Sequence, residues 1–244
     1  MNRLYRRSKS WIGRHLRRRI RYSRMFLDFR AALSLHPQEQ MLHDIMQYLA
    51  STSMQGDYLE FGVYEGWSLI AACKFSQMYG LNAMKFYAFD SFQGLPEMEA
   101  QDETDYPQYK QGDYSCDRAS FDRNLMAHGI SMERVGVVPG WFEDSLNAQT
   151  KRDLGLERAA VAWFDCDLFT STQSALEFLT DLVQPGTVVV FDDWLAFRGD
   201  PGRGEQRAFQ EWLERNPHIR PIKFGKMGWH GQAFILQSSQ PDEH

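Results

Sequence analysis

The segment Asp57–Ser68 most constrains the fold of this 244-residue chain, because it joins an apolar strand to a turn bracketed by glycines. Leu59 and Phe61 are typical of a buried strand, and a helix-compatible apolar run follows the turn. Gly62 and Gly66 give the backbone conformational freedom in the turn between the strand and this helix. The pattern predicts a strand–turn–helix unit of an α/β sheet, where a ligand can approach the main chain closely.

Two carboxylates, Glu60 and Glu65, flank this turn, and no lysine or arginine stands between Asp57 and Ala72. A phosphate cradle relies on N–H groups and usually on a cationic side chain. The acidic turn instead favours a ligand with a cationic end, such as S-adenosylmethionine. A purely structural turn with solvated acids is the alternative. The residues that we assign here to the donor site are Glu60, Phe61, Gly62, Val63, Tyr64, Glu65, Gly66 and Ser68.

Two further strand ends complete the predicted donor site. The strand Met84–Asp90 ends in an acid about thirty residues beyond the glycine turn, where a carboxylate can accept hydrogen bonds from ribose hydroxyls. A helix or turn cap is the alternative role of Asp90. The short strand Val135–Val138 leads into a second glycine turn with aromatic residues that can border an adenine ring. The additional candidates are Ser91, Gly140, Trp141 and Phe142, together with Asp165 after the strand Ala159–Phe164.

Acid pairs end the next two predicted strands. The apolar run Ala159–Phe164 is followed by Asp165-Cys166-Asp167, and the run Thr187–Phe191 is followed by Asp192-Asp193. Parallel strands present their carboxyl ends at one sheet edge, so these acids are expected to gather there. Like charges gathered in this way need a proton or a cation to compensate them.

Mg²⁺ suits such a group better than Zn²⁺, because hard divalent ions take oxygen ligands whereas Zn²⁺ usually takes histidine or cysteine. The candidate metal ligands are Asp165, Asp167, Asp192 and Asp193. The alternative is that some of these acids cap helices or pair with Arg198 or Arg203.

Charge is distributed unevenly along the chain. Met1–Arg24 holds ten of the 27 lysines and arginines and no acid, which leaves 17 basic against 32 acidic side chains in the rest, a net charge of −15. We expect a basic amphipathic arm over 1–36 and a catalytic domain over 37–240. For the arm, an anionic membrane touched through residues 1–24 and a partner subunit are the favoured partners, and nucleic acid is the least favoured.

The three cysteines show no spacing typical of a metal site. Three cysteines, an odd number without close pairing, favour a reduced, cytoplasmic compartment. Peripheral attachment to a membrane through the arm is the alternative location. The chain has no run of eighteen apolar residues and no apolar secretion signal, so we expect no membrane-spanning segment.

The order of predicted elements indicates an α/β fold with a doubly wound, mostly parallel sheet. Arg220–Phe224 and Gln232–Leu236 are expected to form a C-terminal antiparallel hairpin. The acidic segment Met98–Cys116 lacks periodicity, and we interpret it as a substrate lid.

Five motifs together resemble the macrocin and mycinamicin sugar O-methyltransferases. They are Leu59–Val63, Asp90–Pro96, Pro139–Phe142, Asp165–Phe169 and Asp192–Trp194. The resemblance implies a Rossmann-like class I fold, S-adenosylmethionine as methyl donor, and Mg²⁺ held by the acids after the fourth and fifth strands against vicinal sugar hydroxyls. This chain departs from the family pattern at Cys166, Phe169 and Trp194, where glycine, tyrosine and tyrosine are usual.

The implied reaction is transfer of a methyl group to a hydroxyl of a sugar or glycosylated metabolite. We assign Asp165 and Asp167 as catalytic, with Asp165 preferred as the base, because a sugar hydroxyl needs help to lose its proton near neutral pH. A catechol-type or other small-molecule O-methyltransferase, a metal-independent transferase and a non-catalytic scaffold protein are the alternatives. A nicotinamide-dependent enzyme is disfavoured, since the turn does not match G-x-G-x-x-G.

Overall fold

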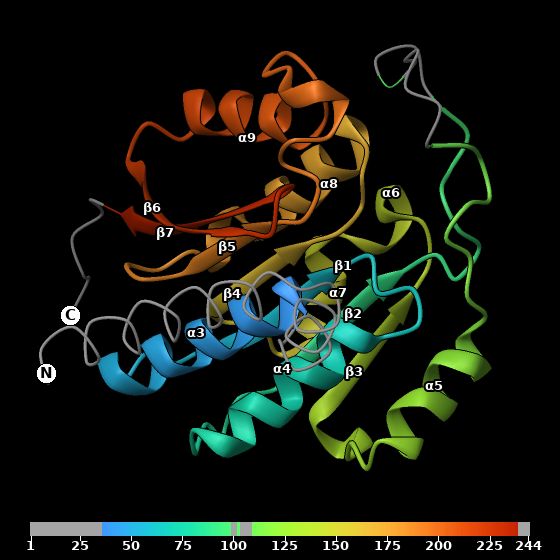
Figure 1. Cartoon of the computed structure of the whole chain (residues 1–244), viewed down its shortest axis with the longest axis vertical. Coiled ribbons are helices and arrows are strands. Elements are labelled where there is room, and N and C mark those ends of the chain that lie inside the picture. The colour runs from blue at the N-terminus through green and yellow to red at the C-terminus, as the bar shows by residue number, and fades with distance from the viewer. Residues whose placement is uncertain (1–35, 99–101, 103–108, 239–244) are drawn as a thin grey trace, which may run out of the picture. The chain divides into compact units, whose positions relative to one another are not determined.

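A seven-stranded sheet forms the centre of the protein in the computed structural model, which describes residues 36–98, 102 and 109–238 (Figure 1). The strand order is β3-β2-β1-β4-β5-β7-β6, with β1 to β5 parallel and β7 and β6 antiparallel. The predicted mostly parallel sheet with a C-terminal hairpin is therefore confirmed. The strands are β1 (Asp57–Phe61), β2 (Phe86–Asp90), β3 (Val135–Pro139), β4 (Ala159–Phe164), β5 (Val188–Phe191), β6 (Ile219–Met227) and β7 (Gly231–Ser238).

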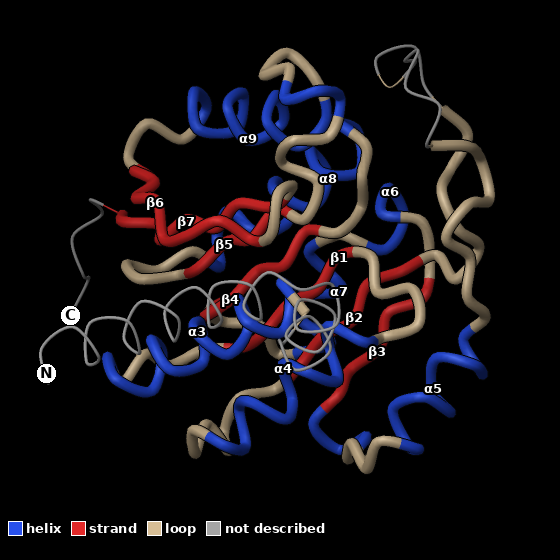
Figure 2. Tube along the Cα trace, viewed as in Figure 1, coloured by secondary structure: helices blue, strands red, loops and turns tan. Residues whose placement is uncertain are grey.

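Helices cover both faces of the sheet (Figure 2). α3, α4 and α5 pack on one face, whereas α8 and α9 lie side by side on the other. No described helix is both long and apolar enough to cross a bilayer. The α-helices are α3 (Pro37–Thr52), α4 (Trp67–Met78), α5 (Arg118–Ala127), α6 (Phe142–Ser145), α7 (Ala148–Leu154), α8 (Phe169–Leu179) and α9 (Gly204–Arg215), and short 3₁₀ turns cover Met132–Arg134, Thr180–Leu182 and Phe197–Gly199.

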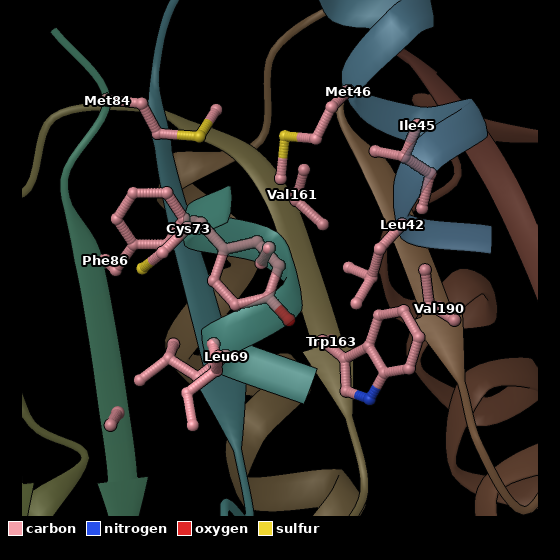
Figure 3. Close-up of a cluster of buried hydrophobic side chains, with 14 of the residues drawn as sticks. Leu42, Ile45, Met46, Leu69, Cys73, Met84, Phe86, Val161, Trp163 and Val190 are labelled. Carbon is pink, nitrogen blue, oxygen red and sulfur yellow. The ribbon is translucent and has the colours of Figure 1, made fainter. Parts of the chain in front are cut away.

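The alternation of side chains along the strands creates two apolar cores. On the α3 and α4 side, Leu42 and Met46 point toward Val161 and Trp163 of β4 (Figure 3). On the α8 and α9 side, Phe61 packs among aromatic rings of the neighbouring strands. Each large apolar side chain buried in this way contributes about 1.5–3 kcal/mol, so the sheet is held rigidly between its helices.

The chain reverses its winding direction between β1 and β4, which are neighbours in the sheet. In doubly wound sheets this switch point opens a crevice at the carboxyl ends of the strands. The turn after β1 and the acids after β4 are thus brought to the same place, as the sequence predicts.

The structure corrects some element boundaries. β2 begins at Phe86 rather than Met84, and α8 ends at Leu179, where a 3₁₀ turn follows. Helix α7 was not expected from the sequence, although Asn147 caps its first amides and Gly155 ends it in the left-handed conformation. The arm lies outside the described residues except for His36, and so does much of the predicted lid.

Candidate active site

A cavity of about 830 Å³ opens at the carboxyl ends of the five parallel strands. Its wall is built from the turns that follow these strands, from the segment after β2 and from the first residues of α8. The lining residues are Gln38, Gly62, Tyr64, Asp90, Ser91, Gly94, Leu95, Pro96, Glu97, Met98, Tyr109, Gln111, Tyr114, Gly140, Trp141, Phe142, Glu143, Asp165, Cys166, Asp167, Thr170, Ser171, Ser174, Asp192 and Asp193.

Asp90 holds the turn after β1 in place. One carboxylate oxygen accepts hydrogen bonds from the amides of Val63 (2.8 Å) and Tyr64 (3.2 Å), and the other accepts from the amide of Phe92 (2.7 Å). The carboxylate also lines the cavity. Asp90 therefore ties two ligand-facing turns together, and its predicted contact with ribose stays a prediction.

Glu60 has a different environment from the one expected for a cavity residue. Its side chain is fully buried under α4 and accepts hydrogen bonds from the hydroxyls of Tyr58 (2.6 Å) and Ser68 (2.5 Å). Burial raises the pKa of Glu60 to about 7, against the opposing effect of these two donors. Neither Glu60 nor Ser68 lines the cavity, so both support the turn from behind.

The predicted donor residues divide into two groups. Eight line the cavity: Gly62, Tyr64, Asp90, Ser91, Gly140, Trp141, Phe142 and Asp165. Six others are not among its lining residues: Glu60, Phe61, Val63, Glu65, Gly66 and Ser68. Phe61 belongs to the core, Glu65 accepts a hydrogen bond from the Trp67 indole (2.8 Å), and Gly66 is the N-cap of α4. The donor assignment itself stays a prediction.

Three of the four predicted metal ligands converge. Asp165, Asp192 and Asp193 each offer an oxygen, and these atoms lie within 4.8 Å of one another. Asp167 is not part of this group but is hydrogen-bonded to Asp193 and to Tyr109. We call Asp165, Asp192 and Asp193 the carboxylate trio.

Burial, and next the neighbouring carboxylates, raise the pKa values of Asp165, Asp167 and Asp192. The pKa of Asp192 is raised to about 6, and those of Asp165 and Asp167 are raised well above their ordinary value. The Gln38 amide donates to Asp192 (2.9 Å), and His230 Nδ1 lies 3.9 Å from the same carboxylate. Arg198 is exposed and Arg203 pairs with Asp200 at 3.5 Å. The described cavity lining contains no lysine, arginine or histidine, so the trio faces the cavity without a cationic side chain in its wall.

Several residues that meet these acids were not predicted from the sequence. Gln38 stands 154 positions from Asp192, and Tyr109 belongs to a segment without periodicity. Glu205 accepts a hydrogen bond from the amide of Asp193 (2.9 Å) while fully buried at the start of α9. Its other oxygen has no partner among the described residues. No local pattern signals such long-range contacts.

Comparisons with known proteins find relatives among the O-methyltransferases. The chain is 32% identical over 164 residues to a tetracenomycin rhamnosyl 4′-O-methyltransferase from Streptomyces olivaceus (62% of this chain, 59% of the relative) and 30% identical over 145 residues to mycinamicin III 3″-O-methyltransferase from Micromonospora griseorubida (57% and 55%). It thus spans less than two thirds of the length of these relatives.

The fold is also similar to that of solved methyltransferases. The O-methyltransferase NovP superposes with a TM-score of 0.71 at 21% identity (82% of this chain, 80% of that one), and the calicheamicin methyltransferase CalS11 with a TM-score of 0.67 at 21% identity (93% and 92%). Residues 31–217 match the macrocin O-methyltransferase (TylF) family. Because this match covers most of the chain, the protein belongs to the macrocin O-methyltransferase family.

Proposed function

We propose that this protein is an S-adenosylmethionine-dependent O-methyltransferase that methylates a hydroxyl of a sugar or glycosylated metabolite with the help of Mg²⁺. The observation that carries the proposal is the carboxylate trio, which lies in the same cavity as the glycine turn after β1. Membership of the macrocin O-methyltransferase family and the names of the two curated relatives support the reaction class.

The trio fits a hard divalent cation. Its three carboxylates come from two adjacent strand ends, and burial together with the neighbouring acids makes Asp165 and Asp192 costly to ionise without a countercharge. Oxygen ligands of this kind suit Mg²⁺, and the trio contains no histidine or cysteine that would favour Zn²⁺. When bound, Mg²⁺ would lower the pKa of an acceptor hydroxyl and so ease its deprotonation.

The donor is assigned to the turns after β1, β2 and β3, on the other side of Asp165. S-adenosylmethionine supplies an electrophilic methyl group: its bond to sulfur breaks as the bond to oxygen forms, and the bonding pair stays on sulfur. Gly62 and Gly140 bring the backbone close to this space, and Trp141 and Phe142 offer apolar edges for an adenine ring. We assign the hydroxyl proton to the carboxylate of Asp165, with Asp167 as the second candidate.

The acceptor is assigned to the mouth of the cavity, beside the trio. The half-exposed rings of Tyr64 and Tyr114 meet edge to face there, with centroids 6.3 Å apart. Aromatic side chains combine an apolar face with a polar tip, which suits a sugar ring with both apolar faces and hydroxyls. The same rings could equally face a flat aromatic acceptor, so the acceptor class rests on the curated relatives.

Calorimetric titration of S-adenosylmethionine into the full-length protein, with and without Mg²⁺, tests the proposal. Donor binding is expected in both conditions, and Mg²⁺ binding is expected for the wild type but not for Asp193→Asn. A protein that binds no donor would be a scaffold. If the protein binds the donor and its turnover is undiminished in excess EDTA, the proposed need for Mg²⁺ is rejected and the proposed methyltransferase activity stands.

A further inference from the structure

The segment between β2 and α5 inserts one aromatic residue, Tyr109, into the wall of the cavity. Only 7% of its surface is exposed. The ring packs in a small apolar cluster with Leu95, Leu168 and Ala196, and it meets the ring of Phe197 with centroids 5.6 Å apart. This cluster joins three separate parts of the chain, so the ring of Tyr109 has a fixed position relative to the ends of β4 and β5.

The hydroxyl of Tyr109 is hydrogen-bonded to both Asp167 and Asp193. A phenol ordinarily titrates at about pH 10, so near neutral pH the hydroxyl carries its proton and acts as a donor. A phenol carries one hydrogen, which it directs to one carboxylate at a time. Asp167 and Asp193 also contact each other, so the three groups form one network.

This network explains why only three of the four acids converge. Asp193 belongs both to the trio and to the network, whereas Asp167 belongs to the network alone. The backbone of Asp167 adopts a left-handed conformation with φ 61°, which costs free energy for a residue with a β-carbon. The Tyr109 hydroxyl is a contact that can hold the side chain of Asp167 outside the trio.

We propose that Tyr109 is a positioning residue that orients Asp193 toward a divalent cation and keeps Asp167 out of the ligand set. The inference rests on the proposed Mg²⁺-dependent function. Residues that hydrogen-bond to metal ligands fix the direction of the ligand lone pairs, and their loss typically weakens metal affinity by about 10- to 100-fold. Tyr109 acts here through the two carboxylates and contacts neither the cation nor the reacting atoms.

Tyr109→Phe tests this role, because it removes the hydroxyl and keeps the ring in its cluster. Tyr114→Phe is the matched control: it lies on the same segment and lines the same cavity, but its ring is 54% exposed and packs on Tyr64. Mg²⁺ alone is titrated into each full-length protein by calorimetry, melting temperature is measured without metal, and kcat and KM are measured at saturating Mg²⁺.

For Tyr109→Phe we expect the Mg²⁺ dissociation constant to rise about tenfold or more and kcat to fall, with an unchanged KM for the methyl donor and a melting temperature close to that of the wild type. Tyr114→Phe is expected to bind Mg²⁺ like the wild type. Equal Mg²⁺ affinities of wild type and Tyr109→Phe would overturn the inference, as would a change confined to acceptor KM or to melting temperature. A wild type that binds no Mg²⁺ would instead overturn the proposed metal function, and this inference with it.

Discussion

The backbone of Gly62 faces the main-chain carbonyl of Asp165 so closely that a β-carbon at residue 62 would lie 1.9 Å from the carbonyl oxygen. Gly62 also has φ +85°, a conformation that L side chains rarely adopt. Two strand ends that carry the predicted donor turn and the predicted base are therefore in direct backbone contact. The distance between the proposed donor and acceptor sites depends on this contact.

Gly62→Ala should destabilise the protein by about 3 kcal/mol or more, since it combines overpacking against a rigid backbone with left-handed strain. Gly80→Ala is the control. Gly80 has φ +73°, but no atom lies within 4 Å of the position that a β-carbon would take there, so only the strain of about 1–2 kcal/mol applies. Denaturant unfolding of both variants compares the two costs. If Gly62→Ala and Gly80→Ala lower the free energy of unfolding by similar amounts, the backbone around Gly62 and Asp165 relaxes easily to accept a β-carbon.

Asp90→Ala should weaken donor binding and also lower the melting temperature, because the side chain accepts three backbone hydrogen bonds. Hydrogen bonds to a charged group contribute about 1.5–3 kcal/mol each. Asp57→Ala is the matched control: it removes one carboxylate–amide bond, to Lys85 (3.0 Å), at the opposite end of β1. Calorimetric donor affinity should fall for the first variant only. If Asp90→Ala binds the donor with the same affinity as the wild type, Asp90 has a structural role only.

The sequence was sufficient to predict the parallel order of the sheet and the convergence of the acids. Both follow from local patterns: apolar runs such as Ala159–Phe164 show which segments are strands, and the residues that end parallel strands share one sheet edge. Which acids converge could not be predicted. The exclusion of Asp167 from the trio depends on its backbone conformation and on Tyr109, which is far away in the sequence.

The assignment of Glu60 shows the same limit. A carboxylate beside a glycine turn was expected to face the ligand, but alternation along β1 directs it under α4, where Tyr58 and Ser68 satisfy it. The residue type indicated a polar function, whereas the side of the sheet on which it lies was determined by pairing with Trp163 and Ala88. The sequence therefore predicted the place of the site better than the direction of its side chains.

Mg²⁺ should stabilise the protein more at pH 8 than at pH 5. The pKa of Asp192 is raised to about 6 and that of Glu60 to about 7, so the folded protein holds protons that the unfolded chain has already lost. Without metal, these groups make stability fall as the pH rises from about 4 to 7. A cation competes with protons for the trio, so its effect grows once the trio is ionised.

Scanning calorimetry in EDTA and in Mg²⁺ at the two pH values measures this difference. Asp193→Asn removes one carboxylate of the trio and is expected to abolish the stabilisation by Mg²⁺ at both pH values. A stabilisation of equal size at pH 5 and pH 8 would contradict the assignment of the trio as the binding site.

Acceptors that carry phosphate groups should be poor substrates. Seven carboxylates line the cavity, and its described lining contains no lysine or arginine. With a dication bound, the trio is ionised; the dication and a cationic donor would then offset three negative charges, and a nucleotide-linked sugar would still meet repulsion from the trio, Asp90, Glu97 and Glu143 together. We expect kcat/KM at low salt to be at least about tenfold lower than for a neutral glycoside of the same sugar, with the gap narrowing as salt screens the charges.

Glu97→Gln and Glu143→Gln remove carboxylates from the cavity wall and should narrow that gap. Glu133→Gln is the control, since this residue is exposed and precedes β3, at the opposite end of the strand from the cavity. An equal kcat/KM for charged and neutral acceptors in the wild type would refute the charge argument while leaving the methyltransferase proposal intact.

The basic arm should be dispensable for chemistry but not for location or assembly. Its ten lysines and arginines within Met1–Arg24 lie outside residues 31–217, which match the family. Each such residue near an anionic membrane adds about 1 kcal/mol of attraction, which salt screens. Deleting Met1–Arg24 should therefore abolish salt-sensitive binding to anionic vesicles and leave turnover in dilute solution unchanged. An arm of the same length with its basic residues replaced by glutamine separates charge from apolar contact. If the deletion lowers the molar mass in solution and the neutral arm preserves it, the apolar residues of the arm hold subunits together. If the deletion abolishes turnover without a change in molar mass, the arm contributes to the active site.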